Sequence, residues 1–483
     1  MYWFKILIIS LNILIFRLMN MDESPSHAHS KLFGCQIHDS IRVSPHALKI
    51  INTPEFQRMR NIKQLGLCHH VYPAATHTRF EHSIGVYHLA GKMLEKIQQQ
   101  YPDYEYDVAE FGRIKLDIKI MECIKIAALC HDIGHGPFSH IFDDILLRNS
   151  SSPNNKHETR SCLIVEMICK RELSEELNEK HISLIKSIIH PESNHKGALY
   201  QIVSNYLNGI DVDKFDYLVR DSKSLGLTMG FNPNRLINEF IIDKNGNIAY
   251  PKHSSIDIYE LFHSRYMMHK KVYNHKTVKL VELMLQDLFM KVDDIFGISK
   301  SIDNMYEFCK LTDQTIFHYI QQIMTPPVFF QINLNNQDLQ KVNDANNIYQ
   351  NILSRQLYQL VLEIPDNDNS EKYLELLVEH LLSIHSNFTR NDFQIIRVKI
   401  GFVSGNKSDP FESIYFYHKK EDNNTFTIKK DKISPIVSSK IQEIKWMLVC
   451  KKRSVYPTVM FEVRKFLKID FSQNFNTNNK SEE

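Results

Sequence analysis

Leu129-Cys130-His131-Asp132-Ile133-Gly134-His135-Gly136-Pro137-Phe138-Ser139-His140 is the stretch that decides the fold, because it follows an apolar segment at helical spacing and gathers three histidines and a carboxylate. Neighbouring His131 and Asp132 can both reach one metal ion if the helix ends there. The glycines and the proline let the backbone turn tightly and keep His135 and His140 near the same spot. The stretch therefore indicates a helix end beside a metal site.

Two further segments complete a set of metal ligands. His82 lies upstream in 78–86, and Asp213 lies downstream in 208–217. With His131 and Asp132 they supply two imidazoles and two carboxylates, which suit a divalent ion such as Fe, Mn, Ni or Zn and leave positions for water or a phosphate oxygen. The alternative is a buried structural cluster, which the order and local context of the three segments disfavour. The other His-Asp pair, His38-Asp39, lacks such context and is expected to be a chance occurrence.

The ordered pattern of these ligands resembles the signature of the HD-domain phosphohydrolases. The resemblance extends to the animal SAM-and-HD-domain deoxynucleoside triphosphate triphosphohydrolases, from about Lys31 to about Arg464. It is strongest over the first two-thirds of the chain, and no SAM module is expected before Lys31. The runs that carry this closer resemblance are 53–66, 79–86, 129–140, 209–221 and 262–276.

Composition agrees with a soluble enzyme. A chain of 483 residues can bury a large core, and a net charge of +2 excludes a global field that draws the protein to nucleic acid or membrane. The eight cysteines are scattered, without a Cys-x-x-Cys pair. They indicate reduced thiols and an intracellular protein of the cytoplasm or nucleus.

The first residues, 1–28, are expected to be an apolar leader or a disordered extension. Met1 to Met19 is mostly apolar, but 6–16 is too short and too interrupted for a confident membrane span. A membrane anchor and a cleaved signal peptide both stay open as alternatives.

The fold class that we expect is mainly α, an HD-domain helical core with a short β-hairpin and a smaller C-terminal α+β lobe. Apolar residues recur at helical spacing over 84–97, 116–129, 161–167 and 280–296. The segment 241–251 alternates around a Lys-Asn-Gly-Asn turn, which predicts the hairpin.

The later chain divides by its pattern. Residues 301–385 look helical with a polar loop near 333–347, whereas 393–400 and 413–417 look like strands. The expected domains are an HD catalytic core over 29–300, a helical connector over 301–391, a C-terminal α+β lobe over 392–470 and a disordered tail over 471–483.

The resemblance implies a reaction in which water attacks the α-phosphorus of a dNTP and the 5′ oxygen departs. His140 would be the general acid at that oxygen, with Asp143 and His157 polarising it, while His135 and Arg79 would touch the phosphates. Histidine suits proton transfer because its unperturbed pKa is ~6.5. A purely structural role is the alternative for His140 and His157.

Substrate contacts are also implied by the resemblance. Cationic side chains and one tyrosine would hold the triphosphate, Gln64 and Asp221 would meet the 3′ hydroxyl, and Leu65 would help to exclude a 2′ hydroxyl. Arg265, His269 and Tyr273 share one helix face. Taken alone, this face would be better explained as a solvated polar surface, but the resemblance favours substrate contacts. All four bases are expected to be accepted. The residues that match the family's substrate contacts are Gln64, Leu65, Arg79, Lys214, Tyr217, Asp221, Arg265, His269, Tyr273 and Asn274.

Regulation by nucleotides is implied as well, because family members bind a guanine nucleotide and a dNTP between subunits and assemble into tetramers. Here Asn52 replaces the carboxylate that reads guanine, and an amide cannot reproduce a bidentate carboxylate. Pro251 and Asp257 replace an arginine and an asparagine of the second effector site. We expect a dimer to tetramer with altered preference for GTP or dNTP activators; a constitutive oligomer is the alternative. The matching effector residues are Lys31, Asn52, Gln57, Arg60 and Arg235.

Two other functions stay open from the sequence. One is another HD-type hydrolase, such as a nucleoside monophosphatase or an alarmone hydrolase. The number of candidate phosphate-binding groups in this chain argues against a monophosphate substrate, since one phosphate needs fewer cations. The other is a nucleic-acid-binding protein on the same fold, supported only by the basic run Lys451-Lys452-Arg453. A divalent metal ion, with Mg on the nucleotide phosphates, is the expected cofactor, and no membrane partner is indicated.

Overall fold

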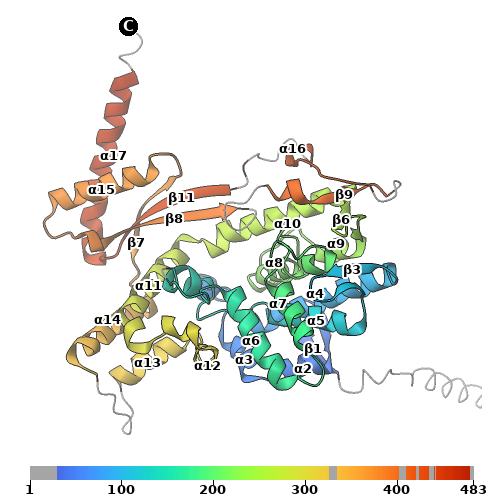
Figure 1. Ribbon diagram of the computed structural model, residues 1–483. Helices are drawn as coiled ribbons and strands as arrows, with labels where there is room; N and C mark the ends of the chain where they lie inside the picture. Colours follow the sequence, from blue (N-terminus) through green and yellow to red (C-terminus); the bar gives the residue numbers. More distant parts are fainter. Residues whose placement is uncertain are drawn as a thin grey trace, which may run out of the picture.

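Helices dominate the computed structural model, which describes residues 30–148, 150–325, 334–401, 409–419, 424–433, 440 and 442–478. The predicted fold class, a mainly α HD-domain core with small sheets, is confirmed (Figure 1). The expected leader, 1–28, lies outside the described residues. No helix in the described part of the chain is both long enough and apolar enough to cross a membrane.

The α-helices are α2 (Pro45–Ile51), α3 (Pro54–Gln57), α4 (Arg79–Gln100), α5 (Ile118–Cys130), α6 (His157–Glu172), α7 (Glu179–Ile189), α8 (Val212–Ser224), α9 (Pro233–Glu239), α10 (Ser255–Met268), α11 (Lys276–Phe296), α12 (Met305–Phe308), α13 (Thr315–Met324), α14 (Asn336–Leu353), α15 (Ser370–Ile384), α16 (Lys430–Ile433) and α17 (Tyr456–Asn478). The strands are β1 (Lys31–Cys35), β2 (Asp39–Val43), β3 (Glu105–Val108), β4 (Gly112–Lys115), β5 (Ile241–Ile242), β6 (Ile248–Pro251), β7 (Gln359–Pro365), β8 (Phe393–Gly401), β9 (Tyr415–Tyr417), β10 (Thr425–Phe426) and β11 (Gln442–Cys450). Short π-helical turns, η3 (Phe142–Leu146) and η6 (His269–Tyr273), follow the histidine-rich stretch and α10.

The core is built around α4, which packs against both α5 and α8. Helix α4 starts with a capping box formed by Thr78 and Glu81, and α5 and α8 start with the aspartate caps Asp117 and Asp211. Each cap satisfies backbone N–H groups that would otherwise lack a partner. The caps therefore fix where each helix begins. They also fix the position of the first-turn side chains along each helix axis.

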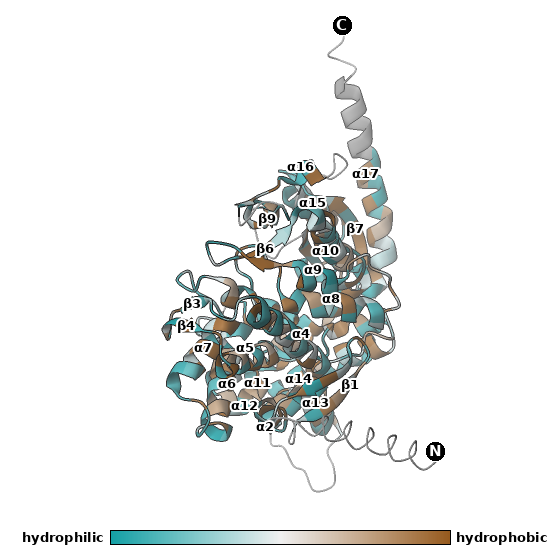
Figure 2. Ribbon diagram, turned by 90° about the vertical axis from the view of Figure 1, so that its right-hand side faces the viewer, coloured by the Kyte–Doolittle hydropathy of each residue, from teal (hydrophilic) through white to brown (hydrophobic). Residues whose placement is uncertain are grey.

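The predicted hairpin over 241–251 is confirmed as β5 and β6, which pair antiparallel. Strand β6 is buried along its length and stands out as hydrophobic in Figure 2. Strand β9 adds to it in parallel, and β10 pairs with β9. The strand expected near 413–417 therefore exists as β9, but it joins the sheet of the core.

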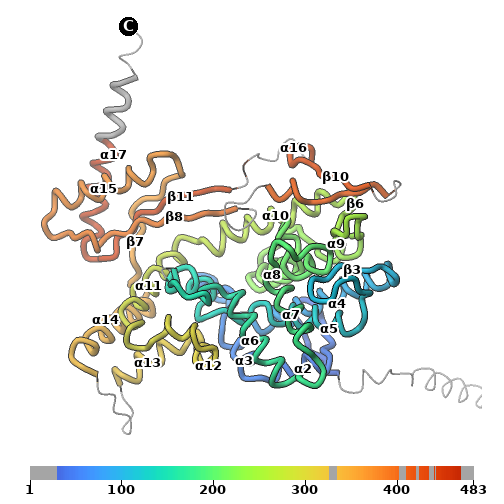
Figure 3. The backbone as a smooth tube through the Cα atoms, in the orientation of Figure 1, coloured from blue at the N-terminus to red at the C-terminus, as the bar shows by residue number. Residues whose placement is uncertain are grey.

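The antiparallel sheet β7-β11-β8, with α15 and α17 packed on it, forms the C-terminal lobe. The lobe therefore includes β7 and α15, which lie before the expected boundary at residue 392. The strand predicted over 393–400 is confirmed as β8. The lobe's small hydrophobic core includes Leu377, Leu448 and Val459. Figure 3 shows the chain running from α14 into β7 of this lobe.

Two expectations for 301–385 are wrong. The segment 359–365 is strand β7, because it pairs with β11 along its length. Most of the polar stretch 333–347 is not a loop, because α14 begins at Asn336, where the Asn335 side chain accepts the N–H of Asp338. Helix α14 buries Val342 and Ala345 and packs along α11.

Helix α17 extends to Asn478, which differs from the expected disordered tail over 471–483; residues 479–483 lie outside the described part.

Candidate active site

The predicted metal ligands converge where three helices meet. His82 lies in the first turn of α4, His131 caps the end of α5 and Asp213 lies in the first turn of α8. The His82 Nε2 atom lies 3.1 Å and the His131 Nε2 atom 3.5 Å from Asp213 Oδ1. Asp132 joins them, with Oδ2 at 3.5 Å from His82 Nε2 and Oδ1 at 3.4 Å from His131 Nε2. His82, His131 and Asp213, from three distant parts of the sequence, thus place ligand atoms close enough to share a cation, and Asp132 lies beside them.

The two imidazoles are oriented as metal-binding histidines are. The Nδ1–H of His82 donates to Asp216 Oδ2 over 2.9 Å, and the Nδ1–H of His131 donates to the Ala128 carbonyl over 2.8 Å. Both Nε2 atoms are buried, and within the described residues neither makes a hydrogen bond of good geometry. Outer bonds of this kind fix the ring and its tautomer. The donor set therefore fits a divalent cation.

The charges around His82 favour a cation there. Burial lowers the pKa of His82, but the nearby carboxylates of Asp213, Asp216 and Asp132 outweigh it, so the pKa rises to about 10. The pKa of Asp213 is held below its usual range despite burial, because both imidazoles face it. A proton or a metal ion can supply the positive charge that this cluster attracts.

A second cluster of histidines lies beside the first. The Nε2 atom of His135 is 3.3 Å from Asp132 Oδ1, and its ring stacks on His157 with centroids 3.9 Å apart. The Nδ1–H of His157 donates to Asp143 over 2.9 Å, and the ring of His140 is 5.1 Å from that of His135. Asp132, His135 and His157 form a second group with ligand atoms close enough to share a cation. The sequence-predicted catalytic residues are thus brought together.

The backbone between these histidines depends on glycine. A Cβ on Gly134 would lie 2.2 Å from the His157 carbonyl oxygen, and one on Gly136 would lie 2.5 Å from the Phe142 ring. Phe138 and Ser139 adopt positive φ values of 60° and 61°, which non-glycine residues seldom do. Such backbone strain persists only where surrounding contacts hold it.

Two buried residues that the sequence analysis missed supply those contacts. The carboxylate of Asp313 accepts the N–H of Phe138 over 2.7 Å and that of Lys63 over 2.8 Å. The guanidinium of Arg58 donates to the carbonyls of Ile133 and His135 over 2.6 and 3.0 Å. Both side chains act on backbone groups, so no motif of chemistry-bearing residues marks them in the sequence.

Cationic side chains border the two clusters. Arg79 is buried, pairs with Asp132 and donates to Ser139 Oγ over 2.9 Å. Lys214 Nζ lies 3.2 Å from Asp211 Oδ2. Arg265 on α10 donates to the Gly401 carbonyl at the end of β8 over 2.6 Å, so the C-terminal lobe contacts a predicted phosphate-binding residue.

The predicted sugar contacts lie together in a buried network. Asp221 accepts a hydrogen bond from Tyr273 over 2.6 Å and one from His77 Nε2–H over 2.7 Å. The N–H of Gln64 donates to the His77 carbonyl, and the buried Gln64 Oε1 has no hydrogen-bond partner among the described residues. His77 was not predicted, although its contact with Asp221 links the two residues that were. Leu65 and Asn274 are buried, and Tyr217 and His269 are half-buried.

The predicted effector residues are only partly connected. Gln57 accepts a hydrogen bond from Arg60 Nε over 2.8 Å, and the Arg60 guanidinium lies 3.5 Å above the Phe80 ring. Asn52 caps the end of α2 and is exposed. Lys31 lies on β1, with Nζ 5.4 Å from the Phe33 ring centroid.

Two other predicted cations carry acidic partners. Arg235 lies 3.1 Å from Asp257, the residue that replaces the family's asparagine. Lys451, in the basic run considered for nucleic acid, lies 2.9 Å from Asp287. In each pair the carboxylate offsets the positive charge, which leaves less of it to attract an anion.

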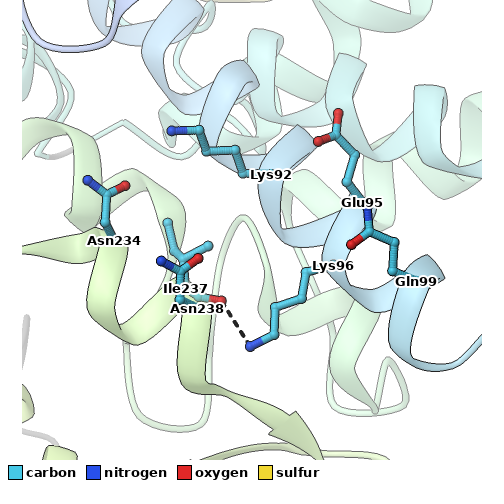
Figure 4. A pocket seen from close by; sticks show the side chains of 7 residues that line it. All are labelled: Lys92, Glu95, Lys96, Gln99, Asn234, Ile237 and Asn238. Carbon is cyan, nitrogen blue, oxygen red and sulfur yellow. Dashed lines mark hydrogen bonds between the residues drawn. The ribbon is translucent and has the colours of Figure 1, made fainter.

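A cavity of about 440 Å³ lies between α4 and α9, outside the predicted site (Figure 4). Its lining includes Lys92 and Lys96, one helical turn apart, together with Glu95. Lys96 donates to the carbonyls of Ile237 and Phe240 over 3.1 and 2.8 Å, and burial lowers its pKa to about 8. The cavity shares no residue with the two histidine clusters.

The fold and the paired histidine–aspartate clusters define an HD domain, and the HD domain model matches residues 79–221. Protein L394 of Acanthamoeba polyphaga mimivirus, which is HD domain-containing by name, is 56% identical over 91% of this chain and 96% of its own. The deoxynucleoside triphosphate triphosphohydrolase SAMHD1 homolog of Dictyostelium discoideum is 33% identical over 93% of this chain and 83% of its own length. For SAMHD1 of Homo sapiens the identity is 30%, over 90% of this chain and 73% of its own. The chain therefore belongs to the family of HD-domain proteins that includes the SAMHD1 triphosphohydrolases.

Replacing His131 or Asp132 by alanine should release the metal. Each change removes one of the four protein ligands assigned to the site. We therefore expect the amount of metal per chain to fall to that of the wild-type protein after treatment with a chelator. Helix content by circular dichroism should change little, because both residues follow the helical part of α5. The measurement is elemental analysis of the purified variants, with exposed His190→Ala as the matched control. Unchanged metal in both variants would show that the ligands are wrongly assigned.

Proposed function

We propose that this protein is a metal-dependent dNTP triphosphohydrolase, which converts a dNTP and water into a deoxynucleoside and tripolyphosphate. The observation that carries the proposal is the pair of buried imidazole Nε2 atoms facing two carboxylates, next to a second group of three histidines. Relatives named as deoxynucleoside triphosphate triphosphohydrolases, similar over most of the chain, support the same reaction.

We assign the metal to His82, His131, Asp132 and Asp213. When bound there, a divalent ion such as Fe, Mn, Zn or Ni would neutralise phosphate charge and lower the pKa of a water molecule. The protein's own contribution is geometric: Asp216 and the Ala128 carbonyl hold the two rings before any ligand arrives. Mg would accompany the phosphates of the nucleotide.

We assign the leaving group to the second cluster. Water attacks the α-phosphorus, the bond between phosphorus and the 5′ oxygen breaks, and His140 donates a proton to that oxygen. His140 is exposed, so a substrate can reach it, while the hydrogen bond between His157 and Asp143 fixes the neighbouring ring. His135 is buried against the His157 ring, and together with Arg79 it would contact the phosphates.

We assign the triphosphate to Arg79, Lys214, Arg265 and Tyr217. A guanidinium has five N–H donors, so Arg79 can hold Asp132 and Ser139 and still donate to a phosphate. A monophosphatase would need fewer cations. The other HD-type hydrolases, including an alarmone hydrolase, are distinguished by the product of the reaction.

We assign selection of deoxyribose to Gln64, Leu65, Tyr217 and Asp221. The unpartnered Gln64 Oε1 is a buried acceptor for a sugar hydroxyl. Bulk at Leu65 and Tyr217 would exclude a 2′ hydroxyl sterically. We assign the base to His269 and Asn274, which lie at the start of the π-turn η6 and directly after it, and Tyr273, at the end of η6, to the group of side chains near the phosphates.

We also infer nucleotide activation in a dimer or tetramer, with Lys31, Gln57, Arg60 and Arg235 as effector contacts. The pair between Arg235 and Asp257 supports a weakened second effector site. All eight cysteines lie in the described residues as free thiols, which supports an intracellular location in the cytoplasm or nucleus.

The reaction predicts its products. Purified protein incubated with dATP and Mn²⁺ should release deoxyadenosine and intact tripolyphosphate in equal amounts, because the catalytic groups act at the α-phosphorus. Anion-exchange chromatography with ³¹P detection separates these from the alternatives, and ATP serves as the matched substrate control. Formation of dAMP with pyrophosphate, or release of phosphate in steps, would contradict the proposal.

Asn52 predicts relaxed guanine selectivity. Loss of charge-assisted hydrogen bonds is worth ~1.5–3 kcal/mol, or roughly 10- to 150-fold in affinity. GTP should therefore activate the wild type more weakly, or less exclusively, than it activates Asn52→Asp. The measurement is dATP hydrolysis against titrations of GTP, dGTP, ATP and dATP for both forms, with mass photometry for assembly. A wild type that responds only to guanine nucleotides, with no shift in Asn52→Asp, would show that this site reads guanine differently.

A further inference from the structure

A chain of hydrogen bonds connects the N-terminal hairpin β1–β2 to the metal ligand His82. His38, in the turn of the hairpin, donates from Nε2 to Asp216 Oδ1 over 2.7 Å. The other oxygen of the same carboxylate, Oδ2, accepts the Nδ1–H of His82 over 2.9 Å. One buried aspartate thus joins a hairpin histidine to a ligand histidine.

The carboxylate of Asp216 has little freedom to move. Its side chain is 0% exposed and that of His38 is 8% exposed. Arg220 donates from Nε to Oδ2 over 2.7 Å and from Nη2 to Oδ1 over 2.9 Å. A Cβ on Gly85 of α4 would lie 2.0 Å from Oδ1, so only glycine leaves room for this packing.

The hairpin touches this unit at a second point. The Cys35 sulfur lies 3.6 Å from Arg220 Nη2, and the ring of His38 lies 5.1 Å from that of His88 on α4. Strand pairing through Cys35 and Asp39 holds the two ends of the turn together. The position of His38 is therefore set by the hairpin as a whole.

An outer hydrogen bond of a metal-binding histidine sets the direction of its free nitrogen. Asp216 has two oxygens, and His38 occupies the one that His82 does not. Without His38, Oδ1 would keep only the Arg220 contact, so the carboxylate would be held from the side of the guanidinium alone. The imidazole ring of His82 would then be held less firmly, and its Nε2 atom would no longer be directed at Asp213.

We propose that His38 is a positioning residue, which holds His82 through Asp216 and so couples the β1–β2 hairpin to the metal site. The inference rests on the proposed function only in that the cluster binds a divalent ion. Because Lys31 lies on the same hairpin, binding of a nucleotide at Lys31 would affect the position of His82 through His38 and Asp216. The pair His38-Asp39, expected to be a chance occurrence, thus gains a role through its histidine.

The test is the affinity for Mn²⁺, measured on the full-length protein by the electron paramagnetic resonance signal of the free ion. His38→Ala should weaken Mn²⁺ binding about 10-fold, within the range found for lost outer contacts. His38→Gln, which keeps a donor, should stay within about threefold of the wild type if the hydrogen bond is the cause. The exposed neighbour Ser40→Ala should bind as the wild type does.

Two results would overturn the inference: unchanged affinity in His38→Ala, or equal weakening in His38→Ala and His38→Gln. If the alanine variant does not fold, His38→Phe keeps the ring volume without the donor and replaces it in the comparison. The readout needs no substrate, so absence of dNTP hydrolysis would reject the proposed reaction and leave this test intact. A wild type that binds no Mn²⁺ would overturn both.

Discussion

Two imidazole nitrogens that face buried carboxylates are the constraint on which the rest of this structure depends. The Nδ1 atoms of His82 and His131 already donate to protein acceptors, so only their Nε2 atoms remain to meet Asp132 and Asp213. Each buried charge costs several kcal/mol of desolvation, and a cation at the centre would offset that cost. The fold therefore holds the ligands of this cluster in position for a metal before the metal binds.

The fold meets this constraint with helix ends. Ligands in the first turns of α4 and α8 and at the end of α5 are held by caps and backbone contacts. The surrounding cations Arg79 and Arg265 are buried and are held by their own hydrogen bonds. The turn after α5 needs Gly134 for close packing and Asp313 to hold the strained Phe138 backbone. The C-terminal lobe contributes the Gly401 carbonyl to Arg265, so a segment far along the chain borders the same site.

The sequence predicted the side chains that carry chemistry far better than those that support them. His82, His131, Asp132 and Asp213 were foreseeable because their types and order form a motif. Asp216, Arg58 and Asp313 were not, since their roles depend on which backbone or ring the fold brings to them. Strand β7 could have been found from the alternation of Leu360, Leu362 and Ile364, but its helical neighbours obscured it. Helix α14 was hidden by its asparagine-rich composition, because packing on α11 overrides weak helix propensity.

We propose that the histidine and aspartate cluster directs water to the α-phosphorus of a dNTP. Hydrolysis of dATP in H₂¹⁸O, followed by mass spectrometry of both products, tests it most directly. We expect one ¹⁸O atom in the tripolyphosphate and none in the deoxyadenosine, because the bond between phosphorus and the 5′ oxygen breaks. Label in the 5′ hydroxyl of deoxyadenosine, or in orthophosphate released from the γ position, would contradict it.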